Sequence, residues 1–425
     1  MTSALIAIAS LLGLLILGVP MVAALLVAVA LNFYLGGQWG MMLPQTMVSG
    51  VSQFTLLALP LFVLAGVIMN AGGISGRLFE FARALVGWMR GGLAQVNVLT
   101  SMFFGGMIGS STADLAGSSS ILIPAMKREG YPGDVAAAVS ASSCGIGPLI
   151  PPSSPMILYS AITGTSLGAL FLAGLIPGIL LGLTFMVLVM FLAWRRGWRR
   201  HGSLSGWDIL RSGRRASLAF GMPAIIVGGL AFGVFTPSEA GAFAVVYAIL
   251  VSVFAYRTLH LRELYRVFVV GLQLTGELLI IVSLSFALGA SLSSAHVPQI
   301  LASVIDVLTI GDGMFARLLV LVILAVLAGM FLDPLIPVLV PVILPTLLFY
   351  DADLLHFGVL MVMSVVIGQL TPPLAIALII TGRIAGVDQM RIFVTNLPFL
   401  LTLVAFTLVL MAFPGIATWL PSITQ

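Results

Sequence analysis

The sequence predicts an all-α polytopic membrane protein with two inverted structural repeats, and its composition and two matching motifs support this prediction. Of its 425 residues, 60% are hydrophobic and only 8% are charged, and the mean hydropathy is +1.20. Soluble proteins carry about 25% charged residues. The stretch Met1–Gly72 has no charged side chain at all. Such segments are solvated by lipid, where a helix satisfies its own backbone hydrogen bonds.

Two proline-rich motifs, Gly147–Pro152 and Gly368–Pro373, lie 221 positions apart within apolar sequence. Each proline lacks an N–H group and clashes with the preceding turn, so each motif should break a helix. Shifting the ten prolines that precede residue 200 by 221 positions places four of them on another proline: Pro124 on Pro345, Pro151 on Pro372, Pro152 on Pro373 and Pro177 on Pro398. We therefore expect a first repeat over residues 1–194 and a second over 217–425.

Each repeat should contain a re-entrant helical hairpin followed by a broken transmembrane helix. Val96–Ile108 has only 13 residues, which is roughly 20 Å of helix. The hydrocarbon core is about 30 Å thick, so this segment should turn back in mid-membrane. Val320–Phe331 has 12 residues and should behave alike. We expect hairpins at about 93–126 and 316–349, and broken helices at about 135–162 and 355–382.

Basic residues are concentrated between the repeats, in a predicted linker at 195–216. The segment holds seven arginines: Arg195, Arg196, Arg199, Arg200, Arg211, Arg214 and Arg215. Short basic loops between spans stay in the cytoplasm, so the net charge of +4 indicates topology and not nucleic-acid binding. The first positive charge is Arg77, which leaves a periplasmic N-terminus allowed. The segment Arg77–Arg90 has charges on one side and is predicted as an amphipathic helix in the membrane interface.

The breaks carry the atoms that a monovalent cation requires. Gly109–Asp114 offers three hydroxyls and a carboxylate at a predicted hairpin tip, and Gly145–Pro152 adds carbonyls freed from helix bonding. The second break would use Gly329, Gly368 and Thr371. The sequence has no cluster of carboxylates for Ca²⁺ or Mg²⁺, no histidine cluster and no phosphate-binding loop. These serines and threonines could instead satisfy backbone groups across helices. We favour binding of Na⁺, and expect no organic cofactor.

Two acidic residues lie at the predicted tips, and each has two interpretations. A carboxylate within the membrane is a functional candidate, but it can also cap a helix N-terminus. Asp333 precedes Pro334, which favours a cap because proline suits the first helical position. For Asp114 the two interpretations are balanced. The single cysteine, Cys144, excludes an intrachain disulfide and fits a small packing residue.

Several motifs, in order and across nearly the whole chain, resemble the large membrane subunit of tripartite ATP-independent periplasmic (TRAP) transporters. The motifs are Gly109–Asp114, Ile123–Tyr131, Gly147–Pro152, Gly329–Asp333, His356–Gly358 and Leu370–Pro373. The resemblance implies a bacterial inner-membrane importer of organic acids that is coupled to Na⁺ and works by an elevator motion. It also implies two partners, a small four-helix membrane subunit and a periplasmic substrate-binding protein. Gln369, Pro334 and Arg383 depart from the family pattern.

The resemblance also implies which residues form the sites. One Na⁺ would be held by Ser110, Ser111, Gly147, Ile150 and Pro151, and the other by Gly329, Gly368, Thr371 and Leu374. We further predict substrate contacts from Thr112, Asp114, Ser153, Asp333 and Thr381.

Three other functions remain to be separated from this one by experiment. A stand-alone ion-coupled dicarboxylate transporter would work without a binding protein. An intramembrane enzyme is disfavoured, because the sequence suggests no Ser–His or Asp–Asp pair at membrane depth. A channel would not show saturable uptake coupled to a gradient.

Overall fold

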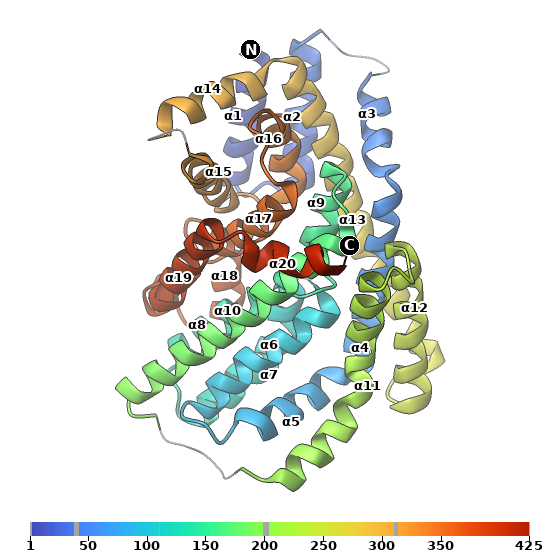
Figure 1. The fold of residues 1–425 in the computed structure, drawn as a ribbon, viewed down its shortest axis with the longest axis vertical. Coiled ribbons are helices and arrows are strands. Elements are labelled where there is room, and N and C mark those ends of the chain that lie inside the picture. The colour runs from blue at the N-terminus through green and yellow to red at the C-terminus, as the bar shows by residue number, and fades with distance from the viewer. Residues whose placement is uncertain (1, 38–41, 110, 199–203, 310–312, 425) are drawn as a thin grey trace.

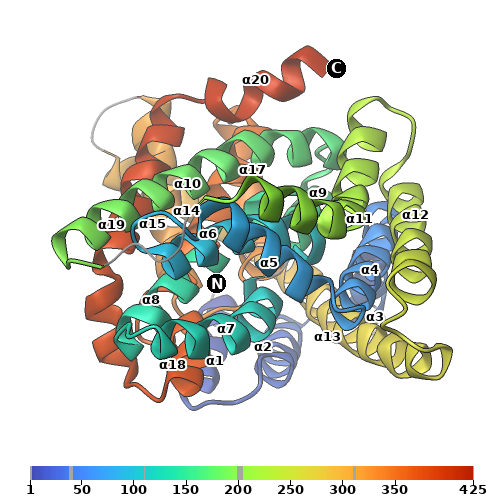
Figure 2. The same ribbon diagram turned by 90° about the horizontal axis from the view of Figure 1, so that it is seen from below.

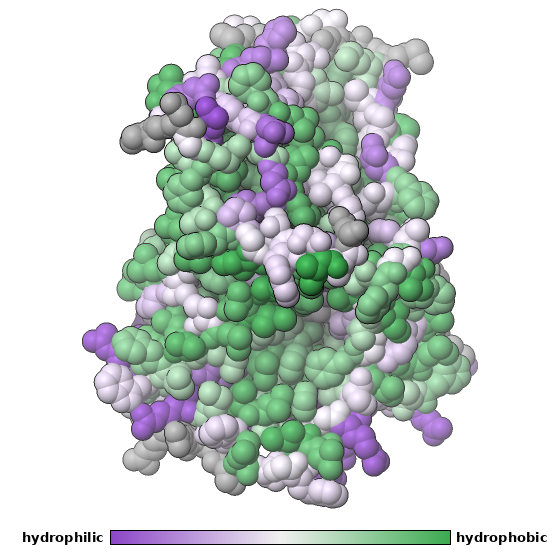
Figure 3. Space-filling model, in the orientation of Figure 1, coloured by the Kyte–Doolittle hydropathy of each residue, from purple (hydrophilic) through white to green (hydrophobic). Residues whose placement is uncertain are grey.

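The computed structural model describes residues 2–37, 42–109, 111–198, 204–309 and 313–424, and these residues contain helices and no strand. Figure 1 shows helices α6 and α7 in the lower half of the molecule and helices α15 and α16 in the upper half. In Figure 3 hydrophobic residues cover most of one face, and hydrophilic residues gather mainly toward its upper and lower ends. This distribution suits a protein whose middle is surrounded by lipid.

The helices of the first part of the chain are α1 (Thr2–Ile16), α2 (Met21–Leu35), α3 (Met42–Val51), η1 (Phe54–Leu57), α4 (Ala58–Ala71), α5 (Ile74–Val86), α6 (Gly92–Ile108), α7 (Ser111–Arg128), α8 (Gly133–Cys144), η2 (Gly147–Leu149), α9 (Ser154–Thr163) and α10 (Leu167–Arg195). Helices α6 and α7 contact each other and meet at Gly109, which adopts the left-handed conformation with φ of 61°. Helix α8 contacts both of them. Glycine permits this turn because it has no Cβ.

The helices of the second part are α11 (Gly206–Ala231), α12 (Pro237–Ile249), the π-helical turn η3 (Leu250–Ala255), α13 (Leu261–Ser294), α14 (Val297–Leu308), α15 (Met314–Gly329), α16 (Ile336–Phe349), α17 (Leu354–Gln369), α18 (Ile376–Ala385), α19 (Gln389–Ala412) and α20 (Gly415–Thr424). Helix α15 contacts α17, as α6 contacts α8. Both halves therefore contain a short helix that ends at a glycine and packs on a broken helix.

Five helical segments of the described chain are long and apolar enough to span a membrane. They are Phe54–Ala71, Leu167–Arg195, Pro237–Ala255, Arg262–Ser294 and Gln389–Ala412. A sixth candidate is the pair Gly133–Leu149 and Ser154–Thr163, which is bent by 40° at its break. Prolines at 151 and 152 explain the bend, because neither can donate a helix hydrogen bond.

Two helices, α8 and α17, are buried on every side. All residues from Val135 to Cys144 and from His356 to Gln369 are buried. Small residues dominate α8, which lets neighbouring helices approach closely. Helices α6, α7, α18 and α19 contact α8, and α15, α10 and α19 contact α17. The two broken helices thus form the centre of the molecule.

A second group of helices lies to one side of this centre. Helix α13 contacts α2, α3 and α4, while α12 contacts α4 and α11, and α11 contacts α5. Figure 2 shows α3, α4, α11, α12 and α13 along the right-hand side of the view. Helix α5 has its apolar residues at a helical spacing on its buried face: Ile74, Leu78, Ala82 and Val86. That pattern is the amphipathic one predicted for Arg77–Arg90.

The predicted arginine-rich linker is partly helical in the described chain, and Arg199 and Arg200 lie outside the described residues. Helix α11 begins at Gly206, where the Ser205 hydroxyl accepts a hydrogen bond of 3.3 Å from the backbone N–H of Asp208. Arg211, Arg214 and Arg215 therefore lie on a helix, and the expectation of a loop was wrong for them. A serine N-cap with an acid in the first turn is a sufficient local reason for the helix to start there.

Candidate functional site

The first break packs directly on the first hairpin. A Cβ added to Gly105 of α6 would lie 2.8 Å from the Cα of Gly147 and 3.1 Å from its carbonyl oxygen. At the tip, the backbone N–H of Ser154 donates a 3.0 Å hydrogen bond to the carbonyl of Gly109. Two glycines facing each other allow the backbones to touch, which places peptide groups of both segments side by side.

The second break packs on the second hairpin in the same manner. A Cβ added to Gly368 of α17 would lie 2.6 Å from the carbonyl carbon of Gly329 and 2.7 Å from its oxygen. Gly329 ends α15, so the close contact lies where that helix stops. Gly329 therefore occupies the same position against the second break as Gly105 occupies against the first.

The backbone hydrogen bonds of the two breaks match at the 221-residue spacing. In the first break the N–H of Leu149 donates to Ile146 and the N–H of Ile150 donates to Gly147. In the second break the N–H of Leu370 donates to Ile367 and the N–H of Thr371 donates to Gly368. Both helices end in the same tight turn, which the prolines then prevent from continuing.

A chain of side-chain hydrogen bonds joins the two halves between the breaks. The hydroxyl of Ser111, the first residue of α7, donates a 2.7 Å bond to Oε1 of Gln369. Nε2 of Gln369 donates a 3.1 Å bond to Oδ1 of Asp333. Ser111 and Gln369 are both buried, and Asp333 is half-buried. The first hairpin, the second broken helix and the segment between α15 and α16 therefore meet at one place.

Three backbone oxygens at the first break and at the end of α15 are unpaired in the described chain. Among the described residues, no hydrogen-bond donor reaches the carbonyl of Ile150, Pro151 or Gly329. The Thr371 hydroxyl donates 2.7 Å to the carbonyl of Ile367, which leaves its lone pairs available as acceptors. Oxygens of this kind suit a hard monovalent cation. The donor set of the predicted sites thus fits Na⁺ chemically.

Other predicted cation ligands are partly occupied by protein groups. The carbonyls of Gly147 and Gly368 each accept a backbone N–H in the turns just described. The carbonyl of Leu374 accepts a 3.0 Å hydrogen bond from Nε2 of Gln389. A carbonyl oxygen has two lone pairs, so these contacts still leave one each. Ser110 lies outside the described residues, and so does the side chain of Thr112.

The cap predicted for Asp333 was wrong. Helix α16 begins at Ile336, its N-cap residue is Leu335, and no side chain caps it. The proline near the helix start is Pro337, not Pro334. The Asp333 carboxylate instead accepts the hydrogen bond from Gln369. The Asp-Pro sequence predicts that this carboxylate caps α16. It instead accepts a hydrogen bond from Gln369, which lies far away in the sequence.

Asp114 is buried behind the tip of the first hairpin. Its side chain is 1% exposed and lies near those of Ser101, Ser118 and Cys144. Neither carboxylate oxygen is aligned for a hydrogen bond with any group of the described chain. Its backbone carbonyl accepts the Ser118 hydroxyl at 2.8 Å. The residue sits in the first turn of α7 and does not join the chain from Ser111 to Asp333.

Ser153 and Thr381 make local helix contacts. The Ser153 hydroxyl caps α9 by accepting from the N–H of Met156 at 3.3 Å, and it donates 2.5 Å to the carbonyl of Pro148. The Thr381 hydroxyl donates 2.9 Å to the carbonyl of Ala377 in its own helix. These bonds give both residues a structural role, and substrate contact by either stays a prediction.

The described residues hold no group of three or more His, Cys, Asp or Glu side chains that could bind a metal ion. Gln369 is the functional candidate that sequence reasoning did not place in the site. The sequence distinguishes Gln369 only by its length and polarity, at a position where the family pattern has smaller or hydroxylated residues. Buried polar side chains need partners, and that rule alone would have justified including it.

The fold and this site define a polytopic membrane protein of the secondary-transporter class, with hairpins packed on broken helices. The chain matches the family model described as the tripartite ATP-independent periplasmic transporter, DctM component, over residues 8–416. It belongs to this family.

Known relatives agree with that assignment. The sialic acid TRAP transporter large permease protein SiaM of Vibrio cholerae is 36% identical over 416 residues, which cover 97% of each chain. The C4-dicarboxylate TRAP transporter large permease protein DctM of Pseudomonas aeruginosa is 36% identical over 87% of this chain and 86% of the relative. The isethionate TRAP transporter permease protein DctMQ of Oleidesulfovibrio alaskensis is 31% identical over 95% of this chain, which spans 64% of that protein.

A solved structure supports the fold. The YdaH transporter of Alcanivorax borkumensis superposes with a TM-score of 0.61 at 16% sequence identity, covering 87% of each chain. The predicted class, an all-α polytopic membrane fold with a broken transmembrane helix, is confirmed. The chain is thus the large permease component of a TRAP transporter.

Proposed function

We propose that this permease imports an organic acid together with Na⁺, and that a periplasmic binding protein delivers the acid. The observation that carries the proposal is that each broken helix packs on a hairpin helix, beside backbone oxygens that accept no hydrogen bond from any described residue. Sialic acid, C4-dicarboxylates and isethionate appear in the names of the relatives. These acids share a negatively charged group, which a site that also binds a cation would help to neutralise.

The chemical roles divide between the two halves. Carbonyls of Ile150 and Pro151, with the Ser111 hydroxyl, would contact one Na⁺. The Gly329 carbonyl and the Thr371 hydroxyl would contact the other. Each Na⁺ would be transported down its own gradient. If the ions and the acid bind together, the Na⁺ gradient drives uptake of the acid.

We further propose an elevator motion, in which the buried centre slides against the outer helices. The centre contains both hairpins and both broken helices. Outside it, α4 contacts α12 and α13, and α13 contacts α3; this outer set meets the centre where α13 contacts α16 and where α4 contacts α6 and α9. Ser111, Gln369 and Asp333 join the halves of the centre, so the two ion sites would move as one body.

A face of α13 suits the small membrane subunit of such a transporter. Gln273 and Glu277, one helical turn apart, are exposed within the span Arg262–Ser294. No hydrogen bond or ion pair to Glu277 exists among the described residues. A charged side chain facing lipid costs several kcal/mol, so a donor from a neighbouring membrane helix would stabilise the complex.

The test is uptake by proteoliposomes that contain this chain, its small subunit and the binding protein. Radiolabelled sialic acid, succinate and isethionate are offered with and without the binding protein. Saturable uptake of one acid that requires the binding protein supports the proposal. Equal uptake without the binding protein would instead identify a stand-alone anion transporter.

A further inference from the structure

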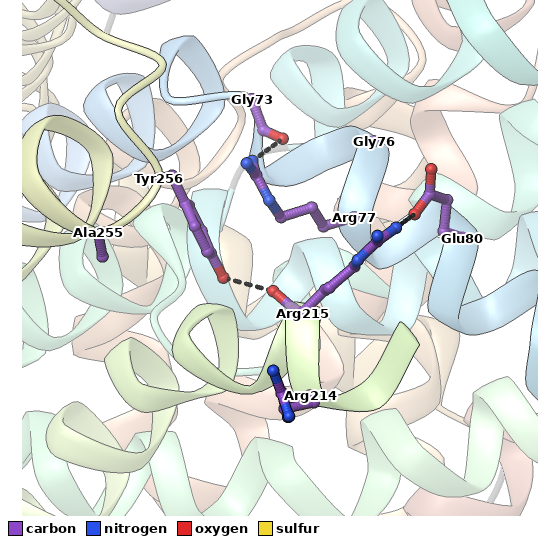
Figure 4. Close-up of a pocket in the computed structure, with 8 residues that line it drawn as sticks. All are labelled: Gly73, Gly76, Arg77, Glu80, Arg214, Arg215, Ala255 and Tyr256. Carbon is purple, nitrogen blue, oxygen red and sulfur yellow. Dashed lines mark hydrogen bonds and ion pairs between the residues drawn. The ribbon is translucent and has the colours of Figure 1, made fainter. Parts of the chain in front are cut away.

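A pocket away from the ion site lies between the outer helices at the arginine-rich end of the fold. It has a volume of about 510 Å³ and is lined by α5, α11 and the end of η3 (Figure 4). Three arginines, Arg77, Arg214 and Arg215, and one acid, Glu80, contribute its charged groups. The lining therefore has a net charge of +2. Basic pockets between membrane helices on the cytoplasmic side are suited to acidic lipid headgroups.

The arginines of the pocket are only partly paired with other groups of the described chain. The Arg77 guanidinium lies 3.8 Å from the centre of the Tyr256 ring and donates a 3.0 Å hydrogen bond to the carbonyl of Gly73. The Arg215–Glu80 contact is 3.9 Å long and both side chains are more than half exposed, so it is weak. Arg214 is exposed, and its side chain has no partner among the described residues.

Tyr256 connects the pocket walls without adding negative charge. Its hydroxyl donates a 2.9 Å hydrogen bond to the backbone carbonyl of Arg215. Burial raises the pKa of Tyr256, although the nearby Arg77 opposes this, so the phenol stays protonated. The aromatic ring thus holds Arg77 while the hydroxyl holds α11 against the end of η3.

An exposed apolar stripe runs along the candidate span Pro237–Ala255, whose last residue lines the pocket. Phe243, Val246, Leu250 and Phe254 follow one another at helical spacing, and each is between 50% and 64% exposed. The stripe ends beside Ala255 and Tyr256, which line the pocket. A charged cavity at the end of an exposed apolar helix face matches a molecule with an acidic head and long acyl chains.

We propose that this pocket binds the headgroup of an anionic phospholipid, whose phosphodiester lies among Arg77, Arg214 and Arg215 while its acyl chains follow the apolar stripe. Guanidinium groups bind phosphate oxygens through paired hydrogen bonds. The lipid would bridge α5, α11 and α12 and fix the outer helices against which the centre moves.

The test measures the melting temperature of the full chain in detergent as lipid is titrated. Phosphatidylglycerol should raise the melting temperature, whereas phosphatidylcholine, which carries no net charge, should not. Glycerol 3-phosphate supplies a free phosphate group without acyl chains and should have no effect at equal concentration. Equal stabilisation by glycerol 3-phosphate would mean that the pocket binds a free phosphate, and equal stabilisation by phosphatidylcholine would mean that charge is irrelevant. Either result overturns the proposal.

Two variants change the pocket by independent means. Arg214→Gln removes one charge and breaks no hydrogen bond or ion pair with a described residue. Gly76→Met fills the space while keeping every charge, because a Cβ at Gly76 meets nothing within 4 Å. Each should raise the phosphatidylglycerol concentration needed for half-maximal stabilisation at least tenfold. The control is Arg83→Gln. Arg83 is an exposed arginine of α5, the helix of Gly76, and lies outside the pocket, so this variant should respond as the wild type does. Wild-type responses from both pocket variants would refute the site.

Discussion

The side chains of Ser111 and Gln369, 258 positions apart, meet in a 2.7 Å hydrogen bond within the buried centre of the molecule. Gln369 passes the connection to Asp333 through its other amide atom. A glutamine can do this because its amide offers an acceptor and two donors at once. The two repeats are therefore tied together beside the site where cation and substrate would bind.

Replacing Gln369 should weaken this connection measurably. Gln369→Met keeps the size of the side chain but leaves the Ser111 hydroxyl without its acceptor and Asp333 without its donor. Unmet buried polar groups cost about 1–3 kcal/mol each, so the melting temperature should fall. Gln53→Met, at an exposed glutamine whose side chain caps nothing, should leave the melting temperature unchanged. An unaffected Gln369→Met protein would show that the bridge contributes nothing to stability.

The close glycine contact at the second break makes Gly368 intolerant of even one methyl group. In Gly368→Ala the new Cβ would lie 2.6 Å from the backbone of Gly329, so the hairpin must move. Overpacking of this kind costs about 1–3 kcal/mol. Gly276→Ala on α13 has open space and should stabilise the helix by up to about 1 kcal/mol. Thermal unfolding of both purified variants checks the contrast, and equal melting temperatures would contradict the packing argument.

The Thr371 hydroxyl should matter for Na⁺ binding beyond its bond to Ile367. Thr371→Val preserves shape but removes an oxygen that we propose as a Na⁺ ligand. Half-maximal stabilisation by NaCl should therefore need about tenfold more salt, with choline chloride as the ionic-strength control. Thr402→Val removes a comparable hydroxyl that donates 2.8 Å to Pro398 in its own helix. That control should keep the wild-type response to Na⁺. If both variants respond alike, Thr371 is not a ligand.

Glu277 should be required for assembly with the small membrane subunit. Glu277→Leu removes the charge from an exposed position in mid-span, so the large chain alone should be no less stable, but the small subunit should dissociate during purification. Glu277→Gln keeps the hydrogen-bonding group and should retain the partner. The ratio of the two subunits after affinity purification is the measurement. A complex that survives Glu277→Leu intact would place the interface elsewhere.

Sequence reasoning located the breaks because their cause is local. Prolines at 151, 152, 372 and 373 stop a helix wherever they occur. Both pairs occupy equivalent positions, 221 residues apart, so both halves contain the same helix break. The partners of the breaks were harder to predict. That Gly105 faces Gly147, or that Gln369 reaches Ser111, depends on how distant segments pack, and single-sequence patterns do not contain that information.

Two predictions were wrong, one because of a distant partner and one because of neighbouring residues. Asp333-Pro334 has the signature of a helix start, but the carboxylate is taken by Gln369 and the helix begins after it. The arginine-rich segment looked like a loop, although Ser205 and Asp208 already formed a helix-start signal within it. The partner of Asp333 could not be predicted from its neighbours in the sequence, whereas the start of α11 could have been predicted from Ser205 and Asp208.

The most direct measurement is uptake into proteoliposomes that contain the complete transporter, driven by one ion gradient at a time. An inward Na⁺ gradient should produce accumulation of the transported acid, and K⁺ in place of Na⁺ should abolish it. Accumulation driven by an inward proton gradient, with Na⁺ absent on both sides, would contradict the assignment of the broken helices as Na⁺ sites.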